Sequence, residues 1–142
     1  MTDQQEVPTP AMPFHGNVRP ILNEVLHAVD RLLATDEPTI IDLASLPFGP
    51  GELEHLEATL GTGELSATLD ALGTSRIRET VFPGVWWLEH RNAHDEVVGR
   101  YLEITRTPEI ISSQDADIVA GRARLEDQLD NQFLAGGTQH EE

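Results

Sequence analysis

Apolar side chains recur every three or four positions in the first third of the chain, which is the spacing of one face of an α-helix. The residues that follow this period are Ile21, Leu22, Val25, Leu26, Val29, Leu32 and Leu33. Asn17 is suited to cap such a helix, and Pro20 fits its first turn. The sequence therefore predicts an amphipathic helix from residue 17 to residue 34, ended by the run at 36–38.

A second, shorter helix is predicted after a buried strand at 39–43 and a turn at 47–51. The glycines Gly61 and Gly63 end this helix. Its apolar positions are Leu53, Leu56 and Leu60.

From Glu64 onward the apolar period changes to two, which is the alternation of a β-strand with one buried face. Apolar and polar residues alternate first over 65–70, where Leu65, Ala67 and Leu69 form the expected buried side. Turn residues at 83–84 and 92–95 then separate further strands. These strands are predicted at 77–82, 85–90 and 97–105.

The last segment, residues 117–134, returns to a helical period. Its apolar positions are Ile118, Ala120, Leu125, Leu129 and Phe133. The element order α-β-α-β-β-β-β-α, with hairpin-connected strands, favours the α+β class, so we expect an antiparallel sheet of about four to five strands with helices packed on one face. One domain is expected over 14–135, between flexible tails at 1–13 and 136–142.

The composition excludes several function classes. The chain has no cysteine, so it forms no disulfide, carries no thiolate nucleophile and binds no cluster through its own thiolates. Nine arginines and no lysine stand against 25 acidic residues, and the net charge of −16 opposes binding to nucleic acid or to an anionic membrane. No membrane-spanning run or secretory signal is seen, so we expect a cytoplasmic protein.

The sequence offers little catalytic or metal chemistry. His90 and His94 are four residues apart, but they flank a strand end and a turn, so we expect no metal site and no cofactor. No nucleophile motif or phosphate-binding loop is present, and we expect no catalytic residue. A small enzyme using the strand carboxylates would need a deep pocket lined by Glu79, Glu89 or Glu103, and nearby arginines make solvated ion pairs the simpler interpretation.

The most distinctive segment runs from Glu79 to Glu89 and contains both tryptophans. Because neighbours on a strand point to opposite faces, one of Trp86 and Trp87 enters the core and the other does not. The other lies on the outer face, beneath a loop, or against a partner, where tryptophan is a common hot-spot residue. Two interpretations stay open: one ring binds a partner, or both are structural with one under the terminal helix.

Three blocks of sequence resemble a known family. Their order and spacing are similar to the C-terminal module of hydrogenase expression proteins of the HupH/HyaF type, over residues 20–112, although full-length members are longer and carry an additional region. The pattern Glu-Thr-x-Phe-x-Gly-Val-Trp is the most specific part. The blocks are Ile41–Pro47, Leu60–Leu65 and Ile77–Trp87, continued by Tyr101–Thr105.

The resemblance implies a non-enzymatic accessory protein, or chaperone, for maturation of nickel–iron uptake hydrogenases. Its partners would be an immature subunit, in particular the iron–sulfur small subunit or its twin-arginine export leader, and other hydrogenase accessory proteins. A chain without cysteine would act by shielding or positioning that polypeptide, and its acidity would attract a basic segment. The residues we expect to bind the partner are Glu79, Thr80, Phe82, Trp86 and Trp87.

Two further interpretations of the sequence remain. An acidic decoy or inhibitor could occupy a basic site on another protein, which would require acidic residues concentrated on one face of the fold. An open antiparallel sheet also has edges, and these favour strand-edge pairing of two copies into a homodimer.

Overall fold

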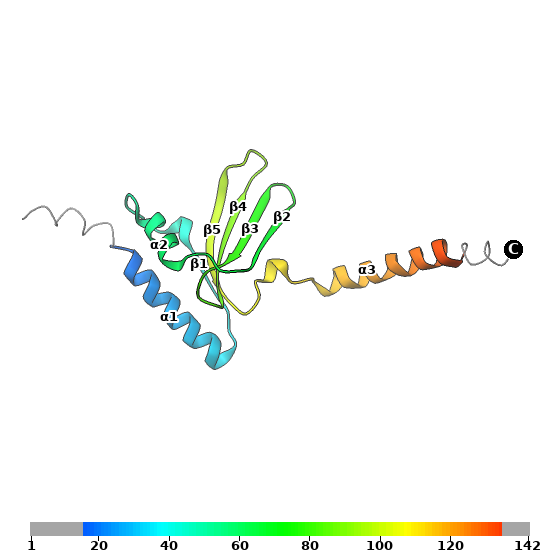
Figure 1. The fold of residues 1–142 in the computed structure, drawn as a ribbon, viewed down its shortest axis with the longest axis horizontal. Coiled ribbons are helices and arrows are strands. Elements are labelled where there is room, and N and C mark those ends of the chain that lie inside the picture. The colour runs from blue at the N-terminus through cyan, green and yellow to red at the C-terminus, as the bar shows by residue number, and fades with distance from the viewer. Residues whose placement is uncertain (1–15, 135–142) are drawn as a thin grey trace, which may run out of the picture. The chain divides into compact units, whose positions relative to one another are not determined.

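The computed structural model describes residues 16–134 and divides the chain into two units, Met1–Pro108 and Glu109–Glu142. The tails expected at 1–13 and 136–142 lie outside the described residues. The first unit contains two α-helices and a five-stranded sheet (Figure 1). Its elements are α1 (Val18–Thr35), β1 (Thr39–Asp42), α2 (Glu52–Leu60), β2 (Ser66–Asp70), β3 (Thr74–Glu79), β4 (Val85–Arg91) and β5 (Val97–Ile104).

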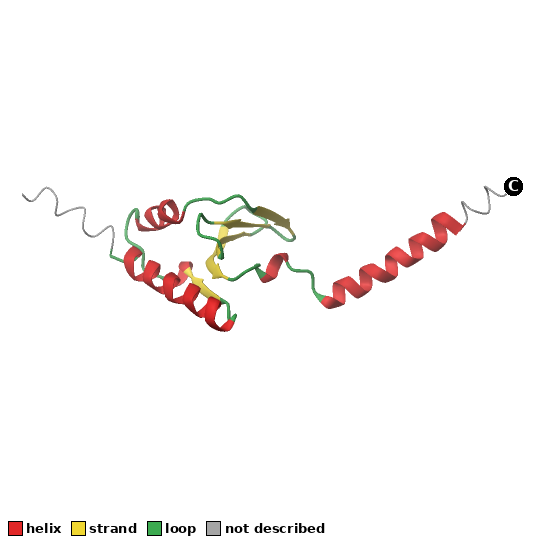
Figure 2. Cartoon of the chain, turned by 60° about the horizontal axis from the view of Figure 1, so that its bottom comes forward, coloured by secondary structure: helices red, strands yellow, loops and turns green. Residues whose placement is uncertain are grey.

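The sheet is antiparallel throughout, with the strand order β1-β5-β4-β3-β2. Strands β2 to β5 follow one another as hairpins, and β1 joins the far side of β5, where Ile41 pairs with Leu102. Figure 2 shows the strands in yellow and the helices in red. Short turns between antiparallel neighbours explain how the predicted order of elements places β2 to β5 side by side, whereas the pairing of β1 with β5 was not predicted. The α+β class is confirmed.

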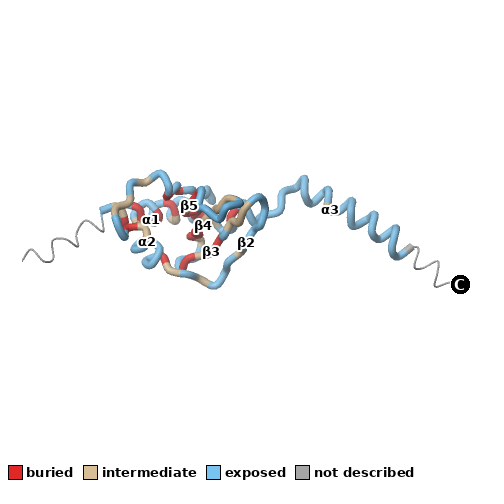
Figure 3. The backbone as a smooth tube through the Cα atoms, turned by 90° about the horizontal axis from the view of Figure 1, so that it is seen from above, coloured by how far each residue is buried: buried red, intermediate tan, exposed pale blue. Residues whose placement is uncertain are grey.

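The main core lies between α1, α2 and one face of the sheet, as the buried segments in Figure 3 indicate. Alternation along the strands sends every second side chain to this face, which is why core residues of one strand, such as Val85 and Trp87, are two positions apart. Fully burying one such aliphatic side chain stabilises the fold by about 1.5–3 kcal/mol. The sheet residues of the main core are Ile41, Val85, Trp87, Leu102 and Ile104, and the buried helix residues are Val18, Ile21, Val25, Ala28, Leu32, Leu56 and Leu60.

A buried carboxylate connects the starts of the two helices. Glu52, at the first position of α2, is only 2% exposed. Its Oε1 accepts hydrogen bonds from the Gly49 N–H (2.6 Å) and the Asn17 side-chain amide (3.2 Å), and its Oε2 accepts one from the Asn17 N–H (3.1 Å). The bond from Gly49, together with those from Asn17, lowers the pKa of Glu52 although burial opposes the shift.

This network corrects one expectation about α1. Asn17 occupies the residue before the helix, but its side chain does not cap α1. It donates instead to Glu52 and to the Pro47 carbonyl oxygen (2.8 Å), because the buried carboxylate competes for it.

Two further expectations, one about burial and one about a strand boundary, differ from the structure. Leu65 and Leu69 were expected to be buried, yet they are 58% and 41% exposed, because Leu65 precedes β2 and Leu69 lies in this edge strand, which has a single neighbour. Strand β3 covers Thr74–Glu79 and not 77–82, because the chain leaves the sheet at Thr80 to form a turn.

The second unit contains helix α3 (Asp115–Gln128), which continues as a π-helical turn at Leu129–Leu134. The helix was predicted here, but none of its described side chains is buried. The division of the chain after Pro108 separates this helix from the first unit, and the single domain expected over 14–135 stays a prediction. The exposed apolar residues are Ile118, Leu125, Leu129 and Phe133.

We predict that Glu52→Gln lowers the melting temperature near neutral pH, because an amide nitrogen cannot accept the bonds that the carboxylate accepts. A carboxylate whose pKa is lowered by folding stabilises the protein above its unfolded pKa of about 4.3 and loses this effect as pH falls through the folded pKa. The difference in melting temperature between the parent chain and the variant should therefore narrow as the pH falls below about 4.

The matched control is Glu54→Gln, which changes an exposed carboxylate in the same first turn of α2. Its melting temperature should stay close to that of the parent chain. A Glu52→Gln deficit that persists undiminished in acid would contradict the role given to the ionised carboxylate.

Candidate partner-binding site

The turn between β3 and β4 is held by a buried threonine. Thr80 is 2% exposed, and its Oγ1 accepts a hydrogen bond from the Phe82 N–H (3.1 Å) and donates one to the Val85 carbonyl oxygen (2.9 Å). Gly84 has a φ of 89°, a conformation that favours glycine. These constraints fix a tight turn whose tip, Phe82 and Pro83, is exposed.

This turn forms one wall of an apolar groove of about 370 Å³. Leu26 and Phe82 are 57% and 49% exposed, so the groove is an apolar surface open to a partner. We refer to it as the apolar groove. Its lining consists of Leu22, Val25, Leu26 and Val29 from α1, Thr59 and Leu60 from α2, and Phe82, Pro83 and Val85 from the turn and β4.

The two tryptophans point to opposite faces of the sheet, and both are buried. Trp87 is 3% exposed in the main core, with the Arg78 guanidinium 5.3 Å from its ring centroid. Trp86 is 5% exposed in a separate cluster on the other face, and its indole N–H donates to the Thr105 carbonyl oxygen (3.1 Å). That cluster contains Ile77, Trp86 and Leu88, with Tyr101 against it.

The structure therefore separates the five residues expected to bind a partner. Phe82 lines the apolar groove and is exposed, whereas Glu79 is half-buried and lines a different cavity. Thr80, Trp86 and Trp87 are buried and stabilise the turn and the sheet. Partner binding by these five residues stays a prediction, and the exposed part of the motif is its turn.

The groove residues of α1 were missed by the sequence reasoning, although a signal was present. The apolar stripe of α1 is wider than the face that the sheet buries, and Leu26 lies outside the buried set. A stripe that is wider than one buried face indicates a second apolar contact.

Three carboxylates were considered for acid–base chemistry, and the structure distributes them over three cavities. Glu89 lines one cavity with Trp87, Glu79 lines another beside the β3–β4 turn, and Glu103 lines a third. Burial opposes ionisation of Glu89, but hydrogen bonds and charges from Arg100 and Arg91 outweigh it and lower the pKa of this carboxyl. Within the described residues, no one cavity collects the three groups.

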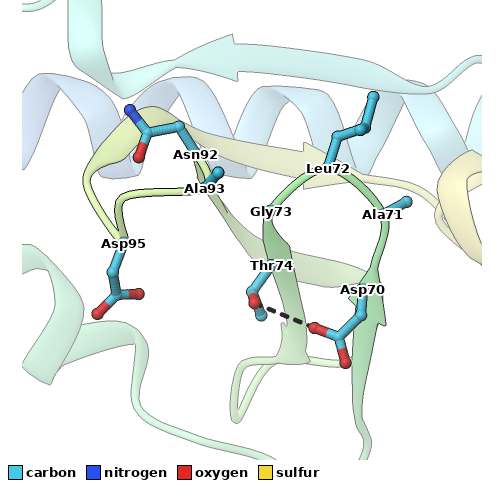
Figure 4. A pocket seen from close by; sticks show the side chains of 8 residues that line it. All are labelled: Asp70, Ala71, Leu72, Gly73, Thr74, Asn92, Ala93 and Asp95. Carbon is cyan, nitrogen blue, oxygen red and sulfur yellow. Dashed lines mark hydrogen bonds between the residues drawn. The ribbon is translucent and has the colours of Figure 1, made fainter.

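A further hollow of about 400 Å³ lies between the tips of the two hairpins (Figure 4). Asp70 accepts a hydrogen bond from the Thr74 hydroxyl there (3.0 Å). Gly73 has a φ of 132°, and a Cβ at this position would collide with the Arg91 carbonyl oxygen. The hollow is thus a consequence of two turns in close contact, and its lining indicates no reaction.

No group of three or more histidines, aspartates and glutamates is placed to hold an ion within residues 16–134. His90 instead shares a hydrogen bond between its Nδ1 and the Ser75 Oγ (2.7 Å) and lies against the Tyr101 ring. No helix of this range is long and apolar enough to cross a membrane.

We predict that Trp86→Ala and Trp87→Ala each lower the free energy of unfolding by about 3 kcal/mol or more, because each removes a buried ring. Phe82→Ala, at an exposed position, should change it by roughly 0.5 kcal/mol or less. Urea denaturation measures all three. A Trp86→Ala variant that unfolds at the same urea concentration as the parent chain would contradict the structural role of the outer cluster.

Comparison with known proteins supports the resemblance seen in the sequence. The model of the family described as "HupH hydrogenase expression protein, C-terminal conserved region" matches residues 16–131. Among curated proteins, hydrogenase expression/formation protein HoxQ of Azotobacter vinelandii is 33% identical over 113 residues, and HupH of Rhizobium leguminosarum bv. viciae is 29% identical over 125 residues. These alignments cover 77% and 83% of this chain, but the chain spans only 39% and 44% of those relatives.

A solved structure shares the fold. The hydrogenase expression protein HupH from Thiobacillus denitrificans superposes with a TM-score of 0.79 at 45% sequence identity. The match covers 82% of this chain and 97% of that one. The family match and this structural likeness lead to one conclusion: the chain belongs to the HupH hydrogenase expression protein family, through its C-terminal conserved region.

Proposed function

We propose that this chain is a cytoplasmic accessory protein of nickel–iron hydrogenase maturation, and that it acts as a chaperone for an immature hydrogenase subunit. Family membership supports this proposal, because the curated relatives are named hydrogenase expression/formation proteins. The chain spans less than half of those relatives, so the role proposed here is that of the conserved region.

The observation that carries the proposal is the apolar groove. It places the exposed Phe82, from the most specific block of the family resemblance, beside the exposed Leu26 of α1. An incompletely folded subunit exposes apolar segments, and a groove between two helices and a turn accommodates such a segment. The proposed occupant is an apolar segment of the iron–sulfur small subunit, including that of its export leader.

Charge supports the choice of the leader. The chain has a net charge of −16, so a partner segment with two neighbouring arginines would be attracted over several ångströms and would bind faster at low salt. The apolar groove would then supply the short-range contacts that hold the segment in place.

The structure fits a chain that shields the subunit better than a chain that catalyses a reaction. The three strand carboxylates line separate cavities, and Glu89 is engaged by two arginines. A chain without cysteine also has no thiolate with which to hold an iron–sulfur cluster during transfer.

We predict that Leu26→Ser and Phe82→Ser each weaken binding of the hydrogenase small subunit by about tenfold, because each removes apolar contact worth about 1.4 kcal/mol. Isothermal titration against the small subunit, with and without its leader, measures the effect. Both positions are exposed, so the melting temperatures of the variants should stay close to that of the parent chain.

The matched control is Leu72→Ser, which removes an exposed leucine from the β2–β3 turn at the opposite end of β3. Its affinity for the small subunit should equal that of the parent chain. If the parent chain binds neither form of the subunit at any ionic strength, the proposed function is wrong. If it binds and both groove variants bind equally well, the function stands and the groove is not the site.

A further inference from the structure

Four of the nine arginines of this acidic chain lie together on one face of the sheet. Register shows how this arises: Arg78 pairs with Trp87, Arg76 pairs with Glu89, and Glu89 pairs with Arg100. All of these side chains share the face of Trp87, and Arg78 lies at the border of the part that the helices cover, where it contacts Glu57 of α2. We call the cluster Arg76, Arg78, Arg91 and Arg100 the arginine cluster.

Three of the four guanidinium groups have ion-pair partners. Glu89 accepts from Arg91 at Oε1 (3.1 Å) and from Arg100 at Oε2 (3.1 Å), so both of its oxygens are engaged. Arg78 pairs with Glu57 (2.6 Å) and also donates to the Gly61 carbonyl oxygen (2.9 Å). These pairs hold the three guanidinium groups in fixed orientations.

Arg76 differs from the other three. It lies directly across from Glu89 in the strand pairing, but the oxygens of Glu89 are already bonded to two other arginines. Over residues 16–134 the structure gives the exposed Arg76 side chain no hydrogen bond and no ion pair. Even when Asp95, 3.7 Å from Arg91, is counted with Glu57 and Glu89, one positive charge of the cluster is left over.

The uncompensated guanidinium group of Arg76 lies beside a cavity. A pocket of about 200 Å³ is lined by Arg76, Arg78, Trp87, Glu57 and Glu89. An unpaired guanidinium beside such a pocket offers two parallel N–H donors, which match the two oxygens of a carboxylate. Glu57 and Glu89 would repel an anion that carries several charges, so the pocket favours a single carboxylate over a phosphate.

We propose that this pocket binds one carboxylate group of a protein partner, with Arg76 as the principal donor. The carboxylate is either an aspartate or glutamate side chain or a free C-terminus. Nucleic acid is a poor candidate because the whole chain carries a charge of −16. The pocket shares no lining residue with the apolar groove, so the carboxylate site does not depend on the proposed function.

The test uses the full chain, labelled with nitrogen-15, and two short peptides followed by NMR. One peptide alternates glycine and glutamate and is blocked at both ends; the other contains glycine alone and has a free C-terminal carboxylate. We expect saturable shifts of the Arg76 and Arg78 side-chain N–H signals and of the Trp87 indole signal, and affinity that falls as salt is added.

Arg76→Gln should weaken peptide binding by roughly tenfold, and Arg76→Lys should give an intermediate loss because it keeps the charge but not the paired donors. The melting temperature should not change, because the Arg76 side chain has no hydrogen bond or ion pair to lose in the described part of the chain. The matched control is Arg19→Gln, which makes the same charge change at an exposed position of α1 and should alter affinity by less than about twofold.

Binding of either peptide with this dependence on Arg76 supports the site, and the peptide that binds more tightly identifies the source of the carboxylate. The proposal is overturned if neither peptide gives saturable shifts, or if a peptide with glutamine in place of glutamate binds as well as the glutamate peptide. It is also overturned if Arg76→Gln binds like the parent chain, or if inorganic phosphate binds more tightly than both peptides.

Discussion

Two helices cannot cover both faces of a five-stranded sheet, and most features of the first unit follow from this shortage. Helices α1 and α2 seal the main core against part of one face, where Trp87 and Leu102 lie. The rest of that face is polar and carries the arginine cluster. The opposite face has to bury Trp86 with strand neighbours and with the chain that follows β5, because its cluster contains no helix residue.

The incomplete cover of the sheet by helices also explains why the segment from Glu79 to Glu89 contains both buried structural residues and an exposed apolar one. Thr80 and the tryptophans are buried, so they set the shape of the β3–β4 turn and of the two sheet faces. Phe82 is then presented at the margin of the covered region, next to the part of α1 that the sheet does not bury. The rigid residues of the motif therefore act by positioning an exposed one, which is how protein surfaces keep an apolar contact site without losing the fold.

The sequence was sufficient for those features that depend on local periodicity, namely α1, α2 and the order of the strands along the chain. It was insufficient wherever a distant contact decides the outcome. The end of β3 depends on the Thr80 hydroxyl bonding across its turn, and the side chain of Asn17 is engaged by Glu52 from 35 residues away. Alternation in β2 indicates which side chains share a face, but it does not reveal that the strand lies at an edge. The arginine cluster requires the register of three strands, which no single segment contains.

The edge strand β2 suggests a physical consequence of the acidic composition, which is repulsion between copies of the chain. An edge strand offers unpaired backbone groups and an apolar groove offers hydrophobic contact. Either surface could bind a second copy of the chain. Mutual repulsion between copies that each carry −16 keeps such surfaces apart in a concentrated solution. This colloidal protection disappears as the pH approaches the isoelectric point near 4.5. The excess of carboxylates thus opposes contact between two copies of the chain near neutral pH.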